Sequence, residues 1–109
     1  MKIGIDIEET ARFKTLKANS TFVKRYFSKN EIAYCFSKPK PGVHLAARFA
    51  AKEAFYKATN RTLNFKDIEV SNAPSGRPEL FILGKKHKEI DISISHSAQY
   101  AVAAVLSEN

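Results

Sequence analysis

The alternation of apolar and polar residues at the start of the chain predicts a strand. Isoleucine occupies positions 3, 5 and 7, while glycine and acidic residues fill the positions between them. Because successive side chains of a strand point to opposite faces, Lys2–Ile7 would have one apolar face and one carboxylate face. Asp6 lies on the carboxylate face.

The region before Pro39 predicts short helices. Thr10–Ala18 has helical character with a basic exterior, and Thr21–Phe27 is a short amphipathic segment. Ser28 is followed three residues later by Glu31, which is the spacing of a capping box. This pair should therefore begin a further short helix that ends before Pro39.

A long helix is predicted in the middle of the chain, after a loop at Pro39–Gly42. The helix should cover about Val43–Thr59, and Asn60 suits its C-terminal end because asparagine tolerates the left-handed conformation. Glu53 and Lys57 lie four residues apart, so they share one face of this helix.

Strand-like segments fill the second half of the chain. A turn rich in proline and glycine at 73–78 and a basic turn at 84–89 separate them. A helical centre followed by consecutive strands predicts an α+β fold, with a mainly antiparallel sheet packed on one long helix and shorter helices. The predicted strands are Asp67–Ser71, Glu79–Leu83, the alternating run from Ile90, and Tyr100–Leu106.

Length and composition fit one compact domain over residues 1–109. A chain this short cannot easily enclose a deep cleft, so a site for a large ligand would gain from oligomerisation. The single cysteine, Cys35, excludes an intramolecular disulfide and a multi-cysteine zinc site, and we expect it in the core. The sequence has neither a membrane-spanning apolar run nor a signal-peptide pattern, and we expect a cytoplasmic protein.

The charge balance favours anionic partners. The chain has 18 Lys and Arg against 11 Asp and Glu, a formal net charge of +7. Nucleic acid, phosphate-rich cofactors, membrane surfaces and acidic proteins all fit this balance. A small basic nucleic-acid-binding protein is therefore the competing interpretation, although the basic residues are dispersed and no recognised nucleic-acid motif is present.

Several polar residues have both an ordinary and a functional interpretation. Asp6 is either a solvated edge residue or an oxygen ligand for Mg²⁺, and Glu53 could supply a second carboxylate. Glu53 with Lys57 could also be an ordinary surface ion pair. Arg48 and Lys52, four residues apart, form either a solubilising basic stripe or a phosphate clamp.

Two further segments carry candidate binding groups. The run Ser93-Ile94-Ser95-His96-Ser97 places hydroxyls and a histidine at the end of a strand, where contact with an anion is plausible. A lone histidine is more often a structural group. Gly76-Arg77-Pro78 is most simply a tight turn, and it could also pack against a flat ligand ring.

Four segments together resemble the holo-[acyl-carrier-protein] synthase family of 4′-phosphopantetheinyl transferases. The order and spacing agree along essentially the whole chain, and the helix segment is the most specific. The segments are Ile3-Gly4-Ile5-Asp6-Ile7-Glu8, Ala47-Arg48-Phe49-Ala50-Ala51-Lys52-Glu53-Ala54-Phe55-Tyr56-Lys57-Ala58, Gly76-Arg77-Pro78, and Ser93-Ile94-Ser95-His96-Ser97.

The resemblance implies an activity. Members of this family transfer the phosphopantetheine arm of coenzyme A to a serine of apo acyl carrier protein, release 3′,5′-ADP, and use Mg²⁺. The resemblance to the small subgroup of this family also implies a homotrimer with sites between protomers and a role in fatty acid biosynthesis.

The resemblance also implies roles for individual residues. Asp6 and Glu53 look like Mg²⁺ ligands, and Lys57 matches the lysine that approaches the reacting phosphate. Either Glu53 or a metal-bound water would take the serine proton. The positions that match the family's coenzyme A contacts are Arg48, Gly76, Pro78, Ser95 and His96. The basic residues that resemble the family's docking surface for the acidic carrier protein are Arg12, Lys14, Lys17, Lys24 and Arg25.

The sequence departs from the family pattern in two places. Residues 7–13 are more acidic and less aliphatic than usual, since Glu8 and Glu9 follow the aspartate strand position. Asn60 replaces a glycine that is common after the long helix, a mild change because asparagine tolerates a left-handed cap.

Overall fold

The computed structural model describes residues 1–108, which fold into helices and strands of an α+β protein. The helices are α1 (Thr21–Tyr26), α2 (Lys29–Phe36) and α3 (Pro41–Thr59), with 3₁₀ turns at Thr10–Phe13 and Phe65–Asp67. The strands are β1 (Lys2–Glu9), β2 (Ile68–Asn72), β3 (Pro78–Ile82), β4 (Lys85–Lys86), β5 (Ile90–His96) and β6 (Tyr100–Ser107).

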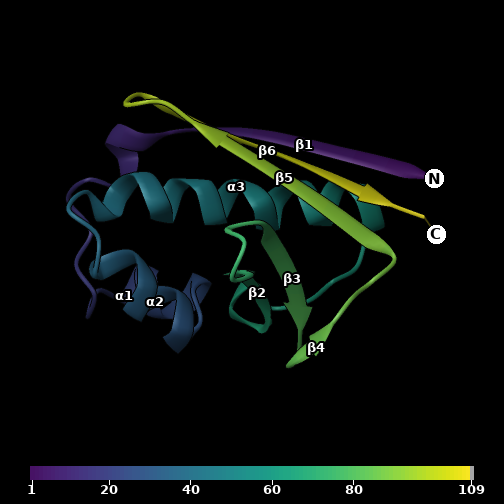
Figure 1. Cartoon of the computed structure of the whole chain (residues 1–109). Coiled ribbons are helices and arrows are strands. Elements are labelled where there is room, and N and C mark those ends of the chain that lie inside the picture. The colour runs from purple at the N-terminus through teal and green to yellow at the C-terminus, as the bar shows by residue number, and fades with distance from the viewer. Residues whose placement is uncertain (109) are drawn as a thin grey trace.

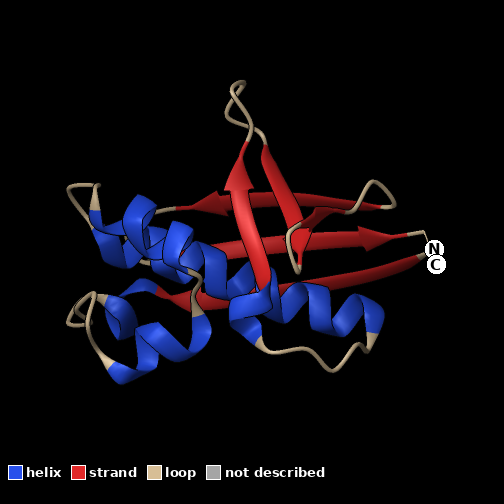
Figure 2. Cartoon of the chain, turned by 90° about the horizontal axis from the view of Figure 1, so that it is seen from below, coloured by secondary structure: helices blue, strands red, loops and turns tan. Residues whose placement is uncertain are grey.

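Two antiparallel sheets lie on either side of α3. The first sheet has the order β1-β6-β5 and runs along the helix, and the second has the order β2-β3-β4. Figure 1 shows the first sheet above α3, with α1, α2 and the second sheet below it. Figure 2 shows the β2–β3 pair crossing the direction of the long strands. Because Lys2 pairs with Ser107, the start of β1 and the end of β6 lie at the same end of the first sheet. The predicted fold class is confirmed.

The predicted helix ends mostly hold. Ser28 and Glu31 form the predicted capping box, and Asn60 ends α3 with a left-handed φ of 57°. The prediction of a loop up to Gly42 was wrong, because Pro41 occupies the first helical position. A proline is tolerated there, since that N–H has no partner within the helix anyway.

The prediction of a helix over Thr10–Ala18 was also wrong. Only Thr10–Phe13 is helical, as a single 3₁₀ element, and the residues after it form turns. Thr10 bonds to distant backbone instead, through its N–H to the Gln99 carbonyl and its hydroxyl to the Ala98 carbonyl. Tertiary bonds and the buried Phe13 therefore fix this segment, which is too short to form a stable helix alone.

The polar face of β1, and not its apolar face, is turned toward the interior. The carboxylate face is turned toward α3, and the isoleucine face is exposed. Gly4 explains how the strand fits, because a Cβ at that position would lie 1.9 Å from the carbonyl oxygen of Ala54. The strand therefore lies almost against the helix backbone, and Asp6 and Glu8 are brought to the edge of α3.

Two apolar clusters share α3. The first packs the C-terminal half of the helix, including Phe55, on β2, β3, β5 and β6. The second packs the N-terminal half, including Phe49, with α1, α2 and the first 3₁₀ turn. Cys35 belongs to the second cluster and is fully buried, as predicted, and burial raises the pKa of its thiol to about 12.

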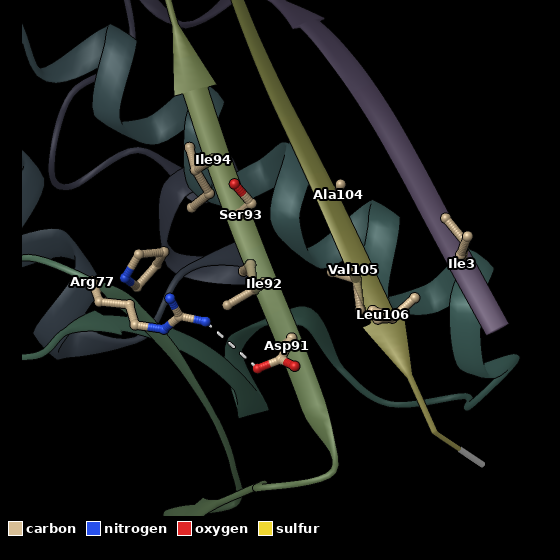
Figure 3. Close-up of a pocket in the computed structure, with 10 residues that line it drawn as sticks. Ile3, Arg77, Asp91, Ile92, Ser93, Ile94, Ala104, Val105 and Leu106 are labelled. Atoms are coloured by element: carbon tan, nitrogen blue, oxygen red, sulfur yellow. Dashed lines mark ion pairs between the residues drawn. The ribbon is translucent and has the colours of Figure 1, made fainter. Parts of the chain in front are cut away.

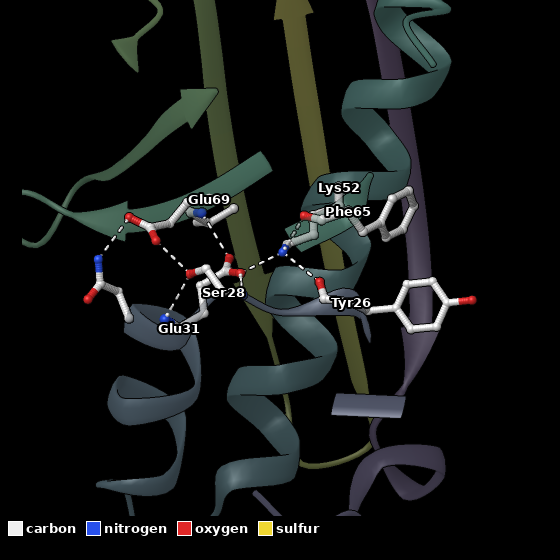
Figure 4. A network of polar contacts seen from close by, with 8 residues as sticks. Tyr26, Ser28, Glu31, Lys52, Phe65 and Glu69 are labelled. Atoms are coloured by element: carbon white, nitrogen blue, oxygen red, sulfur yellow. Dashed lines mark hydrogen bonds and ion pairs between the residues drawn. The ribbon is translucent and has the colours of Figure 1, made fainter. Parts of the chain in front are cut away.

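A buried ion pair joins the segments around α3. The Lys52 ammonium donates to Glu31 Oε1 at 2.5 Å and to the carbonyls of Tyr26 and Phe65 at 2.7 and 2.8 Å. Glu31 in turn accepts the backbone N–H of Val70 at 2.9 Å. Figure 4 shows these bonds joining the end of α1, α2, α3, the second 3₁₀ turn and β2. Burial lowers the pKa of Lys52, and Glu31 opposes that effect.

Both interpretations of Lys52 from the sequence were therefore wrong. Lys52 is 0% exposed and lies in neither a solubilising stripe nor a phosphate clamp. Arg48 is 4% exposed, so it does not contribute to a solvated stripe either. The spacing of four placed both residues on one helix, but only the packing of α1, α2 and β2 over that helix buried them.

We predict that Lys52→Met destabilises the fold by about 3–5 kcal/mol, because it leaves the Glu31 carboxylate buried without its cation. Urea unfolding measures the change, at equal protein concentration for all variants. Lys57→Met is the matched control on the same helix, and its ion pair with Asp6, in which the lysine is exposed, should contribute only about 0–1 kcal/mol. Equal stability of the two variants would contradict the role assigned to the pair.

Candidate functional site

An ion pair joins α3 to β1 at one edge of the first sheet. Lys57 Nζ lies 3.2 Å from Asp6 Oδ1 and donates to the Ile5 carbonyl at 3.1 Å. The second carboxylate oxygen of Asp6, Oδ2, is buried and has no hydrogen-bond partner within residues 1–108. An unpaired buried carboxylate oxygen is costly, so this atom is suited to a cation.

Glu8 lies beside Asp6 and was missed as a site residue by the sequence interpretation. Burial first, and then the neighbouring Asp6 carboxylate, raises the pKa of Glu8 from 4.5 to about 7. Arg12 opposes this shift, since its guanidinium lies 2.7 Å from Glu8 Oε1. The signal was present in the sequence, because residues two apart on a strand share a face.

Glu53 completes a group of three carboxylates at this edge. It is half-buried, and its charge also raises the pKa of Glu8. One turn further along α3 lies Lys57. Within residues 1–108, no three His, Cys, Asp or Glu side chains are arranged as a metal cage. Mg²⁺ does not require such a cage, because it is commonly held by one or two carboxylates, with water and phosphate oxygens. The unpartnered Asp6 Oδ2 fits an ion of that kind.

A small cavity of about 170 Å³ lies at the opposite edge of the sheet, near the end of β5. Four residues proposed from the sequence for coenzyme A line it: Arg48, Gly76, Pro78 and His96. They come from α3, the β2–β3 turn and two strands, so the fold brings together positions far apart in the sequence.

Arg48 is the principal cation of this cavity. Its Nη2 donates to Asn72 Oδ1 at 2.8 Å, and its guanidinium lies 4.2 Å from the centre of the Tyr34 ring. Its Nε is buried and has no hydrogen-bond partner within residues 1–108. A guanidinium held in place with a donor unused is suited to a phosphate or carboxylate. Asn72 and Tyr34 had no signal in the sequence, because only the fold brings them to Arg48.

Ser95 does not line the cavity. Ile94 and His96 line it, and Ser95 lies between them on the alternate, exposed face of β5. The sequence placed Ser95 and His96 together because they are adjacent, but adjacent strand residues point to opposite faces. His44, near the start of α3, also lines the cavity.

The carboxylate edge and the cavity lie at opposite edges of the first sheet. β1 and β5 are the two outer strands of the first sheet, with β6 between them. Arg48 and Lys57 are nine positions apart on α3, which places them about 180° apart around the helix axis. The two cations therefore lie on opposite sides of α3.

The proposed docking residues are spread over the surface. Lys24 and Arg25 line a groove with Lys66, between α1 and the segment after α3. Arg12 is bound to Glu8, and its guanidinium also lies over the rings of Phe13 and Phe49. Lys14 and Lys17 are exposed. Arg12 thus belongs to the carboxylate edge as much as to the basic surface.

Among the residues described, no helix is long and apolar enough to cross a membrane.

Comparison with known proteins identifies close relatives of the chain. The model of the 4′-phosphopantetheinyl transferase superfamily matches residues 2–105. The holo-[acyl-carrier-protein] synthase of Thermodesulfovibrio yellowstonii is 45% identical, over 95% of each chain, and that of Chloroherpeton thalassium is 40% identical, over 99% of this chain and 98% of the other. A crystal structure of the Bacillus anthracis synthase in complex with CoA (3′,5′-ADP) superposes with a TM-score of 0.79 at 37% identity, over 95% of this chain and 92% of the other.

The similarity of sequence and fold extends over nearly the whole chain, including both edges of the first sheet. The resemblance of the four sequence segments is therefore confirmed. The chain belongs to the holo-[acyl-carrier-protein] synthase family of the 4′-phosphopantetheinyl transferase superfamily, a family of enzymes.

Proposed function

We propose that the protein, as one domain over residues 1–109, transfers 4′-phosphopantetheine from coenzyme A to a serine of an apo acyl carrier protein and releases 3′,5′-ADP. The observation that carries this proposal is the pair of sites at the two edges of the first sheet. One edge has carboxylates beside a lysine, and the other has a cavity with an unpaired arginine donor. A diphosphate joined to a nucleotide needs both kinds of site.

The carboxylate edge would hold the reacting phosphates. Asp6 and Glu53 would hold Mg²⁺, which when bound neutralises the charge of the diphosphate. Lys57, which already lies beside Asp6, would place its ammonium on the phosphate that is attacked and can protonate the leaving group. Glu53, half-buried at this edge, is suited to accept the serine proton. Phosphoryl transfer depends mainly on positioning and charge stabilisation, which these residues supply.

The cavity would hold the nucleotide end of coenzyme A. Arg48 and His96 would contact phosphate, and Gly76 and Pro78 would form the wall beside the adenine. Glycine is suited to that place because Gly76 has a φ of 90° in the β2–β3 turn. Ser95 points the other way, and so we propose no contact for it within the same protomer.

The exposed face of the first sheet supports assembly into a ring. Ile3, Ile5 and Ile7 are 60–71% exposed, and each faces an apolar or small residue of β6. In Figure 3, Ile3, Leu106 and Asp91 follow one another across the three strands. Exposed apolar patches of this kind usually mark contact surfaces.

A ring would also join the two sites. In a closed head-to-tail assembly, the β1 edge of one protomer meets the β5 side of the next. A homotrimer of this kind would place the carboxylates of one chain beside the cavity of its neighbour. We accordingly propose a trimer with sites between protomers, working in the cytoplasm in fatty acid biosynthesis.

The nucleic-acid-binding alternative has no support in the structure. Arg48 and Lys52 are buried, and no observation of the described residues favours a nucleic-acid surface. The function itself is tested by incubating the protein with coenzyme A, Mg²⁺ and apo carrier protein, and weighing the carrier by mass spectrometry. A carrier of unchanged mass, with a related synthase active in parallel, would refute it.

We predict that Asp6→Asn and Glu53→Gln each reduce kcat by at least about a hundredfold, because each removes one of two proposed charged ligands. Both variants keep the size of the side chain. Circular dichroism should show an unchanged fold, and calorimetry with Mg²⁺ should show weakened binding. Glu79→Gln on β3, remote from β1, is the control. Normal Mg²⁺-dependent turnover in either folded variant would contradict the assignment.

The proposed assembly predicts complementation between inactive variants. Mixed Asp6→Ala and His96→Ala protomers should regain activity, because a neighbouring pair can combine one intact edge with one intact cavity. Mixed Asp6→Ala and Glu53→Ala protomers are the matched control and should stay inactive, since both changes damage the same edge. Subunit exchange is verified by native mass spectrometry. If the first mixture exchanges but stays inactive, the two residues do not serve one shared site.

The groove at α1 predicts a selective effect on the carrier. Arg25→Glu should raise the carrier's apparent KM on the order of tenfold at low ionic strength and flatten its salt dependence, because it removes long-range attraction to an acidic partner. The KM for coenzyme A should stay the same. Lys88→Glu makes the same charge change on the β4–β5 connection and should have little effect. If the two substitutions raised the carrier's apparent KM equally, the groove at α1 would not be a specific docking site, and the basic charge would serve only general solubility.

A further inference from the structure

His44 is a side chain of the nucleotide cavity that the proposed mechanism does not use. It lies in the first turns of α3 and is half-buried between two rings. Tyr34 of α2 meets it edge-on at 5.8 Å between ring centres, and His96 of β5 meets it at the same distance on another side. Within residues 1–108, neither ring nitrogen of His44 has a hydrogen-bond partner.

The surroundings of His44 are cationic. Arg48 lies one turn further along α3, and Lys38 lies in the connection after α2, over the ring of Tyr34. His96 faces it from β5. The described residues that line the cavity include no carboxylate. Burial first, and then the charges of Arg48, His96 and Lys38, lowers the pKa of His44 from its ordinary value of 6.5. Both burial and the neighbouring cations therefore favour the neutral imidazole in the free protein.

An anion in the cavity would reverse the preference of His44 for its neutral form. A phosphate beside the ring would favour the imidazolium, which has two N–H donors where the neutral ring has one. The cavity holds about 170 Å³, less than the roughly 300 Å³ of the smallest ordinary ligand pockets, so it would take one end of a ligand. That end carries phosphate in a nucleotide such as 3′,5′-ADP.

We propose that His44 is a phosphate-binding residue of this cavity, which takes up a proton from solvent when the phosphate of the nucleotide enters. The proposal rests on the proposed function, since it assigns the cavity to the nucleotide end of coenzyme A. Arg48 supplies a permanent charge, and His44 supplies a charge that forms only with the ligand. Affinity for the nucleotide then rises as the pH falls toward the pKa of the free imidazole.

Calorimetry tests the proton uptake directly. 3′,5′-ADP is titrated into the protein at pH 7.5 in two buffers of different ionisation enthalpy, and the difference in heat gives the protons bound. At this pH a phosphate monoester with a pKa of about 6 is already almost fully ionised, so the uptake belongs to the protein. We expect net uptake in the wild type, little or none in His44→Gln, and the wild-type value in His87→Gln, a histidine paired with Glu89 outside the cavity.

The pH dependence of affinity gives a second measurement. The wild type should bind 3′,5′-ADP about tenfold more tightly at pH 6.5 than at pH 8.0, and His44→Gln should lose most of this difference. In case the substitution disturbs packing on Tyr34, NMR of the wild-type ring follows the pKa of His44, which should rise when the nucleotide is added.

The outcomes separate this proposal from the proposed function. Binding with no proton uptake, or uptake unchanged in His44→Gln, or a His44 pKa that does not move, would overturn the role of His44 and leave nucleotide binding intact. Failure of the wild type to bind 3′,5′-ADP or coenzyme A at all would overturn both.

Discussion

The buried pair of Lys52 and Glu31 is the interaction on which the rest of the structure depends. Its bonds hold the end of α1, the start of α2, the centre of α3, the segment before β2 and β2 itself. A buried ion pair is seldom a net source of stability, but removing one partner is costly. Only the arrangement in which these segments meet keeps both buried charges paired, so the pair selects that arrangement. The Arg48 cavity is built between the same α2, α3 and β2, so its shape follows from this arrangement.

The close approach of β1 to α3 is the second constraint. Gly4 allows it, and the alanines of α3 keep the helix surface flat beneath the sheet. The short distance brings Lys57 to the carbonyl of Ile5 and the carboxylate of Asp6. The same constraint turns the isoleucines of β1 outward, so a polar edge on one face and an apolar surface on the other have a single cause.

The sheet order also explains why a chain of 109 residues would work as an assembly. The carboxylates and the cavity lie on opposite outer strands, and the helix lies between them. The proposed ring would resolve this separation by bringing the two edges of neighbouring protomers together. Arg12 would then have a double role, because it contacts Glu8 of the carboxylate edge and also belongs to the basic surface proposed for the carrier.

The sequence by itself determined most of the elements and the family. The alternation of β1 and β5, the capping box at Ser28 and the end of α3 at Asn60 are local signals, since each depends on residues within a few positions. The segments around Asp6, Glu53, Lys57 and His96 were sufficient to indicate the family. Only the tertiary structure decided which face of β1 is buried, that Lys52 forms an internal ion pair with Glu31, and that Ser95 points away from the cavity. These depend on what packs against each residue from distant parts of the chain, and periodicity gives the faces of an element without saying which of them another element will cover.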